Sequence, residues 1–269
     1  MKQRKVVSRE YKVMLQAAKF AGSERQLLAA SRRLWDDFSR AVVPVVFQSD
    51  GTLETIDKER LIVFLDTDAQ HLRGGGYIFR VRRRLEGDRP EVTLKFRHPD
   101  RYVAESRQMK SRRISTTAKF EEDIKAPFVS LYSYSARGEM GDKAVPATLS
   151  DVARLFPDLS KRLGDVDGRL SLSEVNTFTA RELVVTGGTM RISMKPKVDI
   201  ECALIVWYDH KGAATEPVAV ELSYRYGDSK GQYGGKAARR AFDVFETLQG
   251  EMTEWVDPNP RTKTAFVYG

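Results

Sequence analysis

Apolar and charged side chains alternate along several stretches of this 269-residue chain, most regularly over 77–85 and 91–97. Successive side chains of a strand point to opposite faces, so each stretch predicts a strand with one apolar face and one charged face. The charged faces carry Arg80, Arg82, Arg84, Lys95 and Arg97. Turn residues at 86–90 join the two stretches into a predicted hairpin. Like charges side by side destabilise a sheet, and we therefore expect an anion to occupy this surface.

The same alternation predicts further strands before and after the hairpin. They are expected at 6–15, 60–67, 118–125, 175–183, 189–195, 203–209 and 217–226, with Gly187 and Gly188 turning the chain between two of them. A capping box at Ser23 and Gln26 predicts a helix over 24–42. Apolar residues at helical spacing predict short helices over 149–163 and a closing helix over 237–249. The segments 99–117 and 128–146 give no clear pattern.

These elements amount to eight or nine strands with a few helices, in what we expect to be one α+β domain over 1–269. Most of the strands combine an apolar face with a face that mixes basic and acidic residues. Closing an antiparallel sheet into a β-barrel would turn the charged faces inward, and the helices would pack on the apolar faces outside. An open sheet with its charged face in water is the alternative that alternation alone leaves.

Composition narrows the choice of partner. The chain is 41% hydrophobic and 30% charged, with a net charge of +8, which is typical of a soluble globular protein that favours anionic partners. Few aromatic residues are interleaved with the basic residues of the strands, which argues against nucleic acid. The start of the chain lacks an apolar signal core, and no apolar run approaches the roughly 18 residues that span a bilayer. We therefore expect a cytoplasmic protein without membrane contact.

Several residue types that often carry chemistry do not do so here. The single cysteine, Cys202, excludes an internal disulfide and stands among apolar neighbours, so we expect a buried, inert thiol. The three histidines lack partners at ligand spacing, which argues against zinc. Asp66 and Asp68 resemble a metal-binding pair, but their position at a strand end favours a turn.

The remaining signal is the mixture of arginines and carboxylates on the strands. Arginines clamp phosphate oxygens and carboxylates hold Mg²⁺ or Mn²⁺, so one cavity with both predicts a polyphosphate and its metal ion.

The order of short motifs along nearly the whole chain resembles the CYTH superfamily, the triphosphate tunnel metalloenzymes. The family's Glu-x-Glu-x-Lys strand corresponds to Ser8–Lys12, its Tyr/Phe-x-Asp-Thr element to Phe64–Thr67, its Arg-x-Arg to Arg80–Arg82 and its Thr-Leu-Lys to Thr93–Lys95. Its acidic middle strand, late basic strand and terminal Glu-x-Glu resemble Phe120–Ile124, Arg181 with Arg191, and Glu221–Ser223. Ser8 and Ser223 replace two carboxylates that the family pattern expects, so the predicted metal site has fewer carboxylate ligands.

The resemblance implies a metal-dependent hydrolase of inorganic triphosphate, polyphosphate or an organic triphosphate. It implies that the phosphates are bound by Lys12, Arg80, Arg82, Lys95, Arg97, Arg181 and Arg191. It implies that Mg²⁺ or Mn²⁺ is held by Glu10, Glu121, Asp123 and Glu221, and that Glu10, Lys12, Glu121 and Glu221 are catalytic. For each carboxylate the alternative is a salt bridge inside the barrel. For the whole protein the alternatives are a non-catalytic binder of polyphosphate or nucleotide and, more weakly, an adenylyl cyclase.

Overall fold

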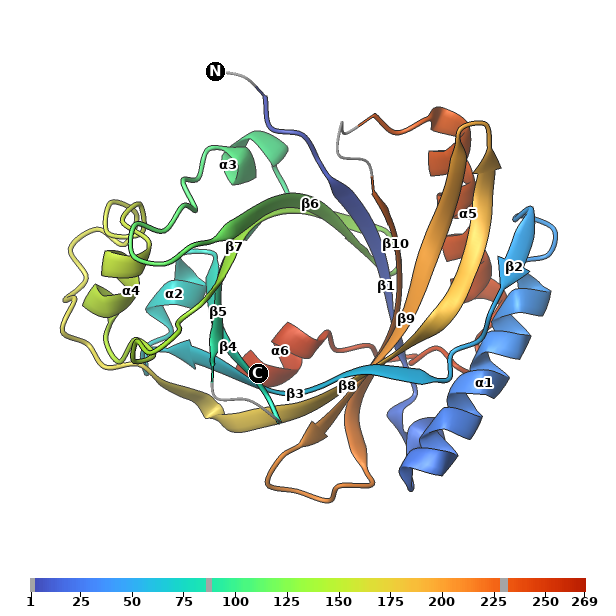
Figure 1. The fold of residues 1–269 in the computed structure, drawn as a ribbon, viewed down its shortest axis with the longest axis horizontal. Coiled ribbons are helices and arrows are strands. Elements are labelled where there is room, and N and C mark those ends of the chain that lie inside the picture. The colour runs from blue at the N-terminus through green and yellow to red at the C-terminus, as the bar shows by residue number, and fades with distance from the viewer. Residues whose placement is uncertain (1–2, 86–88, 228–231) are drawn as a thin grey trace.

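A computed structural model describes residues 3–85, 89–227 and 232–269. Within these ranges nine strands form a closed barrel with helices outside it (Figure 1). They are β1 (Ser8–Leu15), β3 (Thr55–Asp66), β4 (Tyr77–Arg84), β5 (Glu91–His98), β6 (Thr117–Lys125), β7 (Val129–Glu139), β8 (Ser173–Met194), β9 (Lys197–Asp209) and β10 (Pro217–Gly227). Around the barrel the order is β8-β3-β4-β5-β7-β6-β1-β10-β9, and β9 pairs back with β8. The predicted barrel is confirmed. Part of the predicted hairpin turn, 86–88, lies outside the described residues.

One pair of neighbouring strands departs from the antiparallel prediction. β1 runs parallel to β6, while the other pairings around the barrel are antiparallel. The number of strands requires this, because direction cannot alternate all the way round a ring of nine. The barrel is therefore mixed, and β1, the first strand of the chain, fills the position between β6 and β10.

The strand β8 continues through Gly187 and Gly188, where the sequence predicts a turn. A Cβ atom on Gly188 would lie 2.6 Å from Cζ3 of Trp35, so the glycine lets the Trp35 ring pack against the strand backbone. Gly187 has φ +125°, a conformation that glycine adopts without strain. The register between β8 and β9 shifts at this point, as in a β-bulge. The glycine pair therefore bends one long strand and does not end it. The short strand β2 (Gln48–Asp50) pairs with the part of β8 beyond it.

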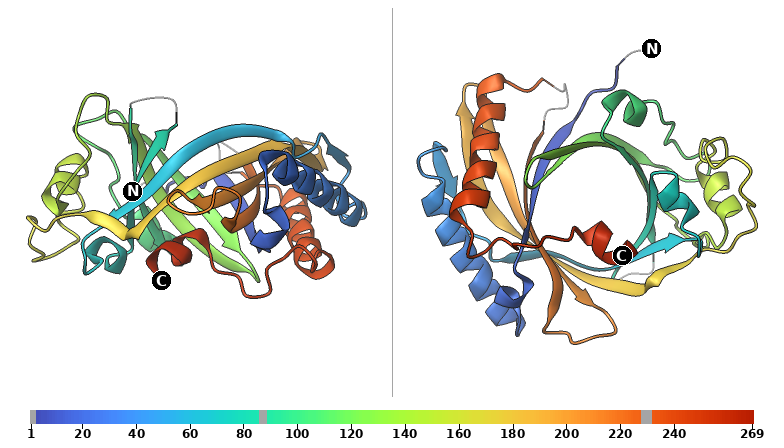
Figure 2. Two further views of the ribbon diagram at one scale, coloured as in Figure 1. Left: turned by 90° about the horizontal axis from the view of Figure 1, so that it is seen from below. Right: turned by 180° about the vertical axis from the view of Figure 1, so that it is seen from behind.

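Two groups of helices cover the apolar outer faces of the barrel (Figures 1 and 2). The long helices α1 (Glu24–Ala41) and α5 (Gly235–Glu251), with the 3₁₀ turn η1 (Ala17–Phe20), cover β1, β8, β9 and β10. The short helices α2 (His71–Gly74), α3 (Arg101–Glu105) and α4 (Leu149–Leu155) cover β4, β5, β6 and β7. The predicted capping box at Ser23 and Gln26 is present. None of the helices in the described ranges combines the length and apolar character that crossing a bilayer requires.

A third apolar cluster lies inside one end of the barrel. The chain runs from α5 to the short helix α6 (Lys263–Tyr268), which lies across that end (Figures 1 and 2). Val267 is buried there against side chains of β3 such as Ile62 and Phe64, and Phe266 packs on Phe178 of β8.

Asp66 lies in the turn before the helix α2. Its carboxylate accepts hydrogen bonds from three backbone N–H groups, which confirms its predicted role in a turn.

The contact between α5 and the barrel provides a test of this packing. Phe245 is fully buried and its ring lies 5.2 Å from that of Tyr11, which stacks on Tyr224 at 5.0 Å. We expect Phe245→Ala to lower the free energy of unfolding by about 3–5 kcal/mol, because the lost ring leaves a cavity. Phe242→Ala, on the same helix at a half-buried position, should cost clearly less. Urea unfolding measures both, and equal losses would contradict the packing described.

Candidate functional site

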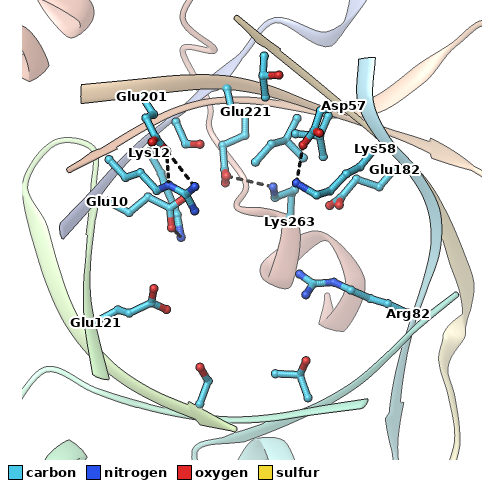
Figure 3. Close-up of a pocket in the computed structure, with 18 of the residues that line it drawn as sticks. Glu10, Lys12, Asp57, Lys58, Arg82, Glu121, Glu182, Glu201, Glu221 and Lys263 are labelled. Carbon is cyan, nitrogen blue, oxygen red and sulfur yellow. Dashed lines mark hydrogen bonds and ion pairs between the residues drawn. The ribbon is translucent and has the colours of Figure 1, made fainter. Parts of the chain in front are cut away.

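The barrel encloses a cavity of about 710 Å³ that all nine barrel strands and the segment 262–264 line (Figure 3). Twelve basic side chains line it, counted over the described residues, against six acidic ones. The acidic side chains are Glu10, Asp57, Glu121, Glu182, Glu201 and Glu221. A cavity with this imbalance attracts anions, and its closed wall limits how far water can screen the charges.

The structure brings most of the predicted site residues together at this cavity. Those that line it are Glu10, Lys12, Arg80, Arg82, Lys95, Arg97, Glu121 and Glu221. Three predicted residues do not line it. Asp123 shares the inward face of β6 with Glu121 and Lys125 but is covered by the cations that bind it, whereas Arg181 and Arg191 point elsewhere.

Arg181 and Arg191 are the residues whose predicted position the structure corrects. Arg181 Nε donates to Glu59 at 2.6 Å, and its guanidinium lies 5.6 Å from the Tyr208 ring, outside the cavity. Its neighbour Glu182 takes the inward position, because successive side chains of β8 alternate faces. Arg191 forms an ion pair with Asp199 at 2.9 Å, beyond the glycine bend of β8.

Asp123 holds a group of cations in place. One oxygen of its carboxylate accepts from Lys12 Nζ at 2.7 Å and the other from Lys95 Nζ at 2.9 Å, and Arg97 Nε lies at 3.5 Å. Asp123 is only 1% exposed. Burial acts to raise its pKa, but the three cations outweigh burial and hold that pKa well below its usual range. Asp123 therefore stays charged and is already surrounded by cations, whereas the sequence predicts it as a metal ligand.

Two arginines of β4 face the cavity with little counter-charge. Arg80 forms no ion pair and no side-chain hydrogen bond with any described residue, and its buried Nε has no partner. Among the described residues, Arg82 forms an ion pair only with Glu91, at 3.4 Å. Burial and the charge of Arg82 lower the pKa of Arg80 well below its usual value, and burial with Arg60 lowers that of Arg82 to about 10. Both groups would be stabilised by an anion in the cavity.

The carboxylates that the sequence assigns to a metal ion are mostly paired with lysines. Glu10 lies 2.8 Å from Lys12 Nζ, and Glu221 lies 3.0 Å from Lys263 Nζ. Burial acts to raise the pKa of Glu10, but the neighbouring cations, Lys12 first and then Lys95, together outweigh burial, and the net pKa is below its usual value. Glu121 points into the cavity and forms no ion pair with a described residue (Figure 3).

The predicted metal ligands that the structure describes are not grouped as a set of free donors. Within the described ranges, no three His, Cys, Asp or Glu side chains lie close enough together to hold one. Three of the four predicted ligands, Glu10, Asp123 and Glu221, already have an ammonium neighbour. The salt-bridge alternative therefore describes them, with lysines as the main partners.

Several cavity residues were not identified from the sequence. Glu182 accepts from Arg60 Nε at 2.7 Å and Trp207 Nε1 at 2.8 Å. Burial raises its pKa, but Arg60 and other cations outweigh burial and bring the pKa to about 2. Lys125, opposite Lys12 in the β1–β6 register, follows the inward parity of β6 and could have been found from it. Lys263 gives no such signal, because it lies on a six-residue helix.

Comparison with known proteins gives distant structural similarities. No protein-family model and no curated protein matches the chain. A putative adenylyl cyclase from Hippeastrum, described as having a dominant triphosphatase activity, is similar over 97% of this chain and 95% of its own, with 13% identity and a TM-score of 0.45. Putative adenylate cyclases from Vibrio parahaemolyticus (9% identity, TM-score 0.37, covering 99% of this chain and 100% of that one) and Bacillus halodurans (12%, 0.38, 97% and 98%) are also similar. Similarity at this level does not assign the chain to a family, and the CYTH resemblance stays a prediction.

Lys125 provides a test of the charge distribution in the cavity. Burial lowers its pKa to about 8, and Arg97 and Lys12 contribute in the same direction. A bound anion favours the charged ammonium, so the complex holds more protons than the free protein. The affinity for tripolyphosphate should therefore fall as the pH rises through about 8, by up to about tenfold per pH unit for each lysine that titrates.

The variant Lys125→Gln removes this ionisation, and we expect a flatter dependence of affinity on pH. Calorimetric titrations between about pH 7 and about pH 9 measure it, because this window brackets a pKa of about 8. Lys110→Gln, at an exposed position away from the cavity, is the control. An unchanged pH dependence in Lys125→Gln would show that Lys125 does not face the bound anion.

Proposed function

We propose that the protein binds a linear triphosphate or polyphosphate in the barrel. The observation that supports this most directly is the pair of largely buried arginines Arg80 and Arg82, of which, among the described residues, one has no carboxylate partner and the other has only a distant one. A guanidinium matches two phosphate oxygens at once, and such charge-assisted hydrogen bonds are stronger than neutral ones. A phosphate anion would therefore offset the cost of keeping these groups charged and buried.

The distribution of cations favours a chain of phosphates over a single phosphate. Arg80 and Arg82 lie on β4, whereas Lys12 lies on β1, and three strands separate them around the barrel. The described residues contribute twelve basic side chains to the cavity, more than the oxygens of one phosphate can contact at once. A linear triphosphate places negative charge on successive phosphorus centres and can reach cations on both sides. The group attached to its end, if any, is not determined by these contacts.

Hydrolysis of the bound anion is the second candidate function, and Glu121 favours it. This carboxylate faces the cavity without an ion-pair partner among the described residues, so it is available to orient or deprotonate a water molecule. Hydrolysis that depends on Mg²⁺ or Mn²⁺ stays a prediction from the sequence, since no three potential ligand side chains of the described residues lie close together. Phosphate release from tripolyphosphate, with and without these ions, separates hydrolysis from binding alone, and a test with ATP covers the cyclase alternative.

Thermal unfolding tests the binding proposal. A ligand that binds only the folded state stabilises it by mass action, so tripolyphosphate should raise the melting temperature. At ten times its dissociation constant, the stabilisation should reach about 1.4 kcal/mol. Orthophosphate at the same concentration and ionic strength should have a far smaller effect, because it meets only part of the cation set. Equal shifts with the two anions, or none with either, would argue against an oligophosphate site.

A pair of arginine variants tests which face of the sheet binds. Arg82→Ala should weaken tripolyphosphate binding by at least about tenfold, because it removes a charged hydrogen-bond donor. It should not lower the melting temperature, since it also relieves repulsion with Arg80 and Arg60. Arg113→Ala, at an exposed position outside the cavity, is the matched control. The same affinity in both variants would mean that Arg82 does not contact the anion.

A further inference from the structure

We infer that Lys263 of the helix α6 is a fixed cation on the acidic side of the cavity, and that the oligophosphate binds there without a divalent metal ion. This inference rests on the proposed function and concerns the same cavity. Carboxylates of the cavity are paired with lysines, so ammonium groups supplied by the chain balance their charge.

The helix α6 holds Lys263 in position. The side chain of Thr262 caps the helix by accepting from the backbone N–H of Ala265 at 3.2 Å. Asn176 of β8 donates to the carbonyl of Val267 at 2.8 Å, and Tyr268 packs against Phe64 of β3. The cap fixes the first turn of the helix, and the other two contacts tie its C-terminal end to the barrel. The backbone position of Lys263 therefore rests on contacts other than its ion pair.

Lys263 lies next to the carboxylate that the sequence assigns to a metal ion. Its Nζ is 3.0 Å from Glu221 and 5.5 Å from the centre of the Trp207 ring, and both partners of the ion pair are largely buried. Figure 3 shows the lysine entering the cavity beside Glu221. Ser223, on the same face of β10, replaces the second carboxylate of the family pattern. One ammonium therefore balances the one carboxylate left on this face.

Lys12 has the same relation to the other two carboxylates. It lies between Glu10, at 2.8 Å, and Asp123, at 2.7 Å. Burial lowers the pKa of Lys12, but the two carboxylates raise it by more, which keeps the ammonium charged. A divalent ion would have to displace an ammonium from each of these carboxylates, inside a cavity that is already rich in cations. Hydrated Mg²⁺ binds to free carboxylate or phosphate oxygens. In this cavity the carboxylates are paired, so we expect the phosphate oxygens to bind the lysine and arginine side chains directly.

Calorimetric titration of the purified protein with tripolyphosphate tests the inference. In EDTA and in Mg²⁺ we expect dissociation constants that agree within about twofold, a difference of about 0.4 kcal/mol. Titration with Mn²⁺ alone should give no detectable heat of binding. If EDTA abolishes binding and Mg²⁺ restores it, the inference is wrong and the proposed function stands. If tripolyphosphate binds under neither condition, the proposed function itself is wrong.

Variants of Lys263 test the residue. Lys263→Gln should weaken tripolyphosphate binding in EDTA by at least about tenfold and make it depend on Mn²⁺, because Glu221 is then unpaired and free to bind a metal ion. Lys263→Arg should retain binding in EDTA. Lys197→Gln, which removes a lysine paired with Asp199 outside the cavity, is the matched control. If Lys263→Gln binds as the wild type does in EDTA and gains no Mn²⁺ dependence, Lys263 is not the fixed cation. Should that variant fail to fold, the comparison of EDTA with Mg²⁺ on the wild type still decides whether binding needs a metal ion.

Discussion

The carboxylate of Asp123 is the interaction on which the organisation of the cavity depends. Lys12 reaches it from β1, and Lys95 and Arg97 reach it from β5 across the intervening strand β7. The inward residues of β7 beside Lys95 and Arg97 are serines, whose short side chains leave the basic side chains room to extend. Without a shared anion, three cations at this spacing would repel one another by several kcal/mol. Asp123 therefore makes a dense group of positive charges compatible with a closed barrel.

The remaining excess of positive charge is supported by the packing outside the barrel. Two apolar clusters under the helices bury one face of the barrel strands, and the opposite face is left to charged groups with incomplete pairing. Unpaired charges of this kind lower the stability of the folded protein. Binding sites commonly retain them, because the same charges bind the ligand when it is present. In this barrel the cost is greatest at Arg80, whose buried Nε has no hydrogen-bond partner and whose guanidinium forms no ion pair with a described residue.

Much of the fold and part of the site could be predicted from the sequence. Strict alternation in β1, β4 and β5 gave the strands and the inward faces of Lys12, Arg80, Arg82 and Lys95, because each of these strands has one wholly apolar parity or nearly so. Alternation failed for Arg181, since β8 has apolar residues at both parities and a charge at each of two neighbouring positions. Periodicity alone cannot say which of Arg181 and Glu182 faces inward. That choice is made by Trp207 and Arg60, which bind Glu182 from the strands on either side.

Other features depend on contacts that no local pattern contains. The alternation does not identify β7, because its apolar residues occur at both parities, with serines among them, so that neither face is wholly apolar. The glycine pair of β8 has the composition of a turn, but the packing of Trp35 against Gly188 makes it a bend. The helix α6 is too short to give a periodic signal, and it forms because the end of the barrel offers it an apolar surface. Lys263 could not be identified from the sequence because it lies on this short helix.

The position of β1 between β6 and β10 has a consequence for how the chain folds. Ser8 pairs with Glu121 on one side and with Gly227 on the other. Both partner strands of β1 are therefore distant from it in the sequence. Closing such long loops costs entropy before any contact repays it, and proteins dominated by distant pairings fold slowly. Until β10 pairs with β1, the backbone N–H and C=O groups along one edge of β1 are unpaired. Strands of other chains can form hydrogen bonds with such an edge. The ring that later encloses the cavity is thus an exposed sheet during synthesis, and its exposure ends only when residues near the far end of the sequence have been made.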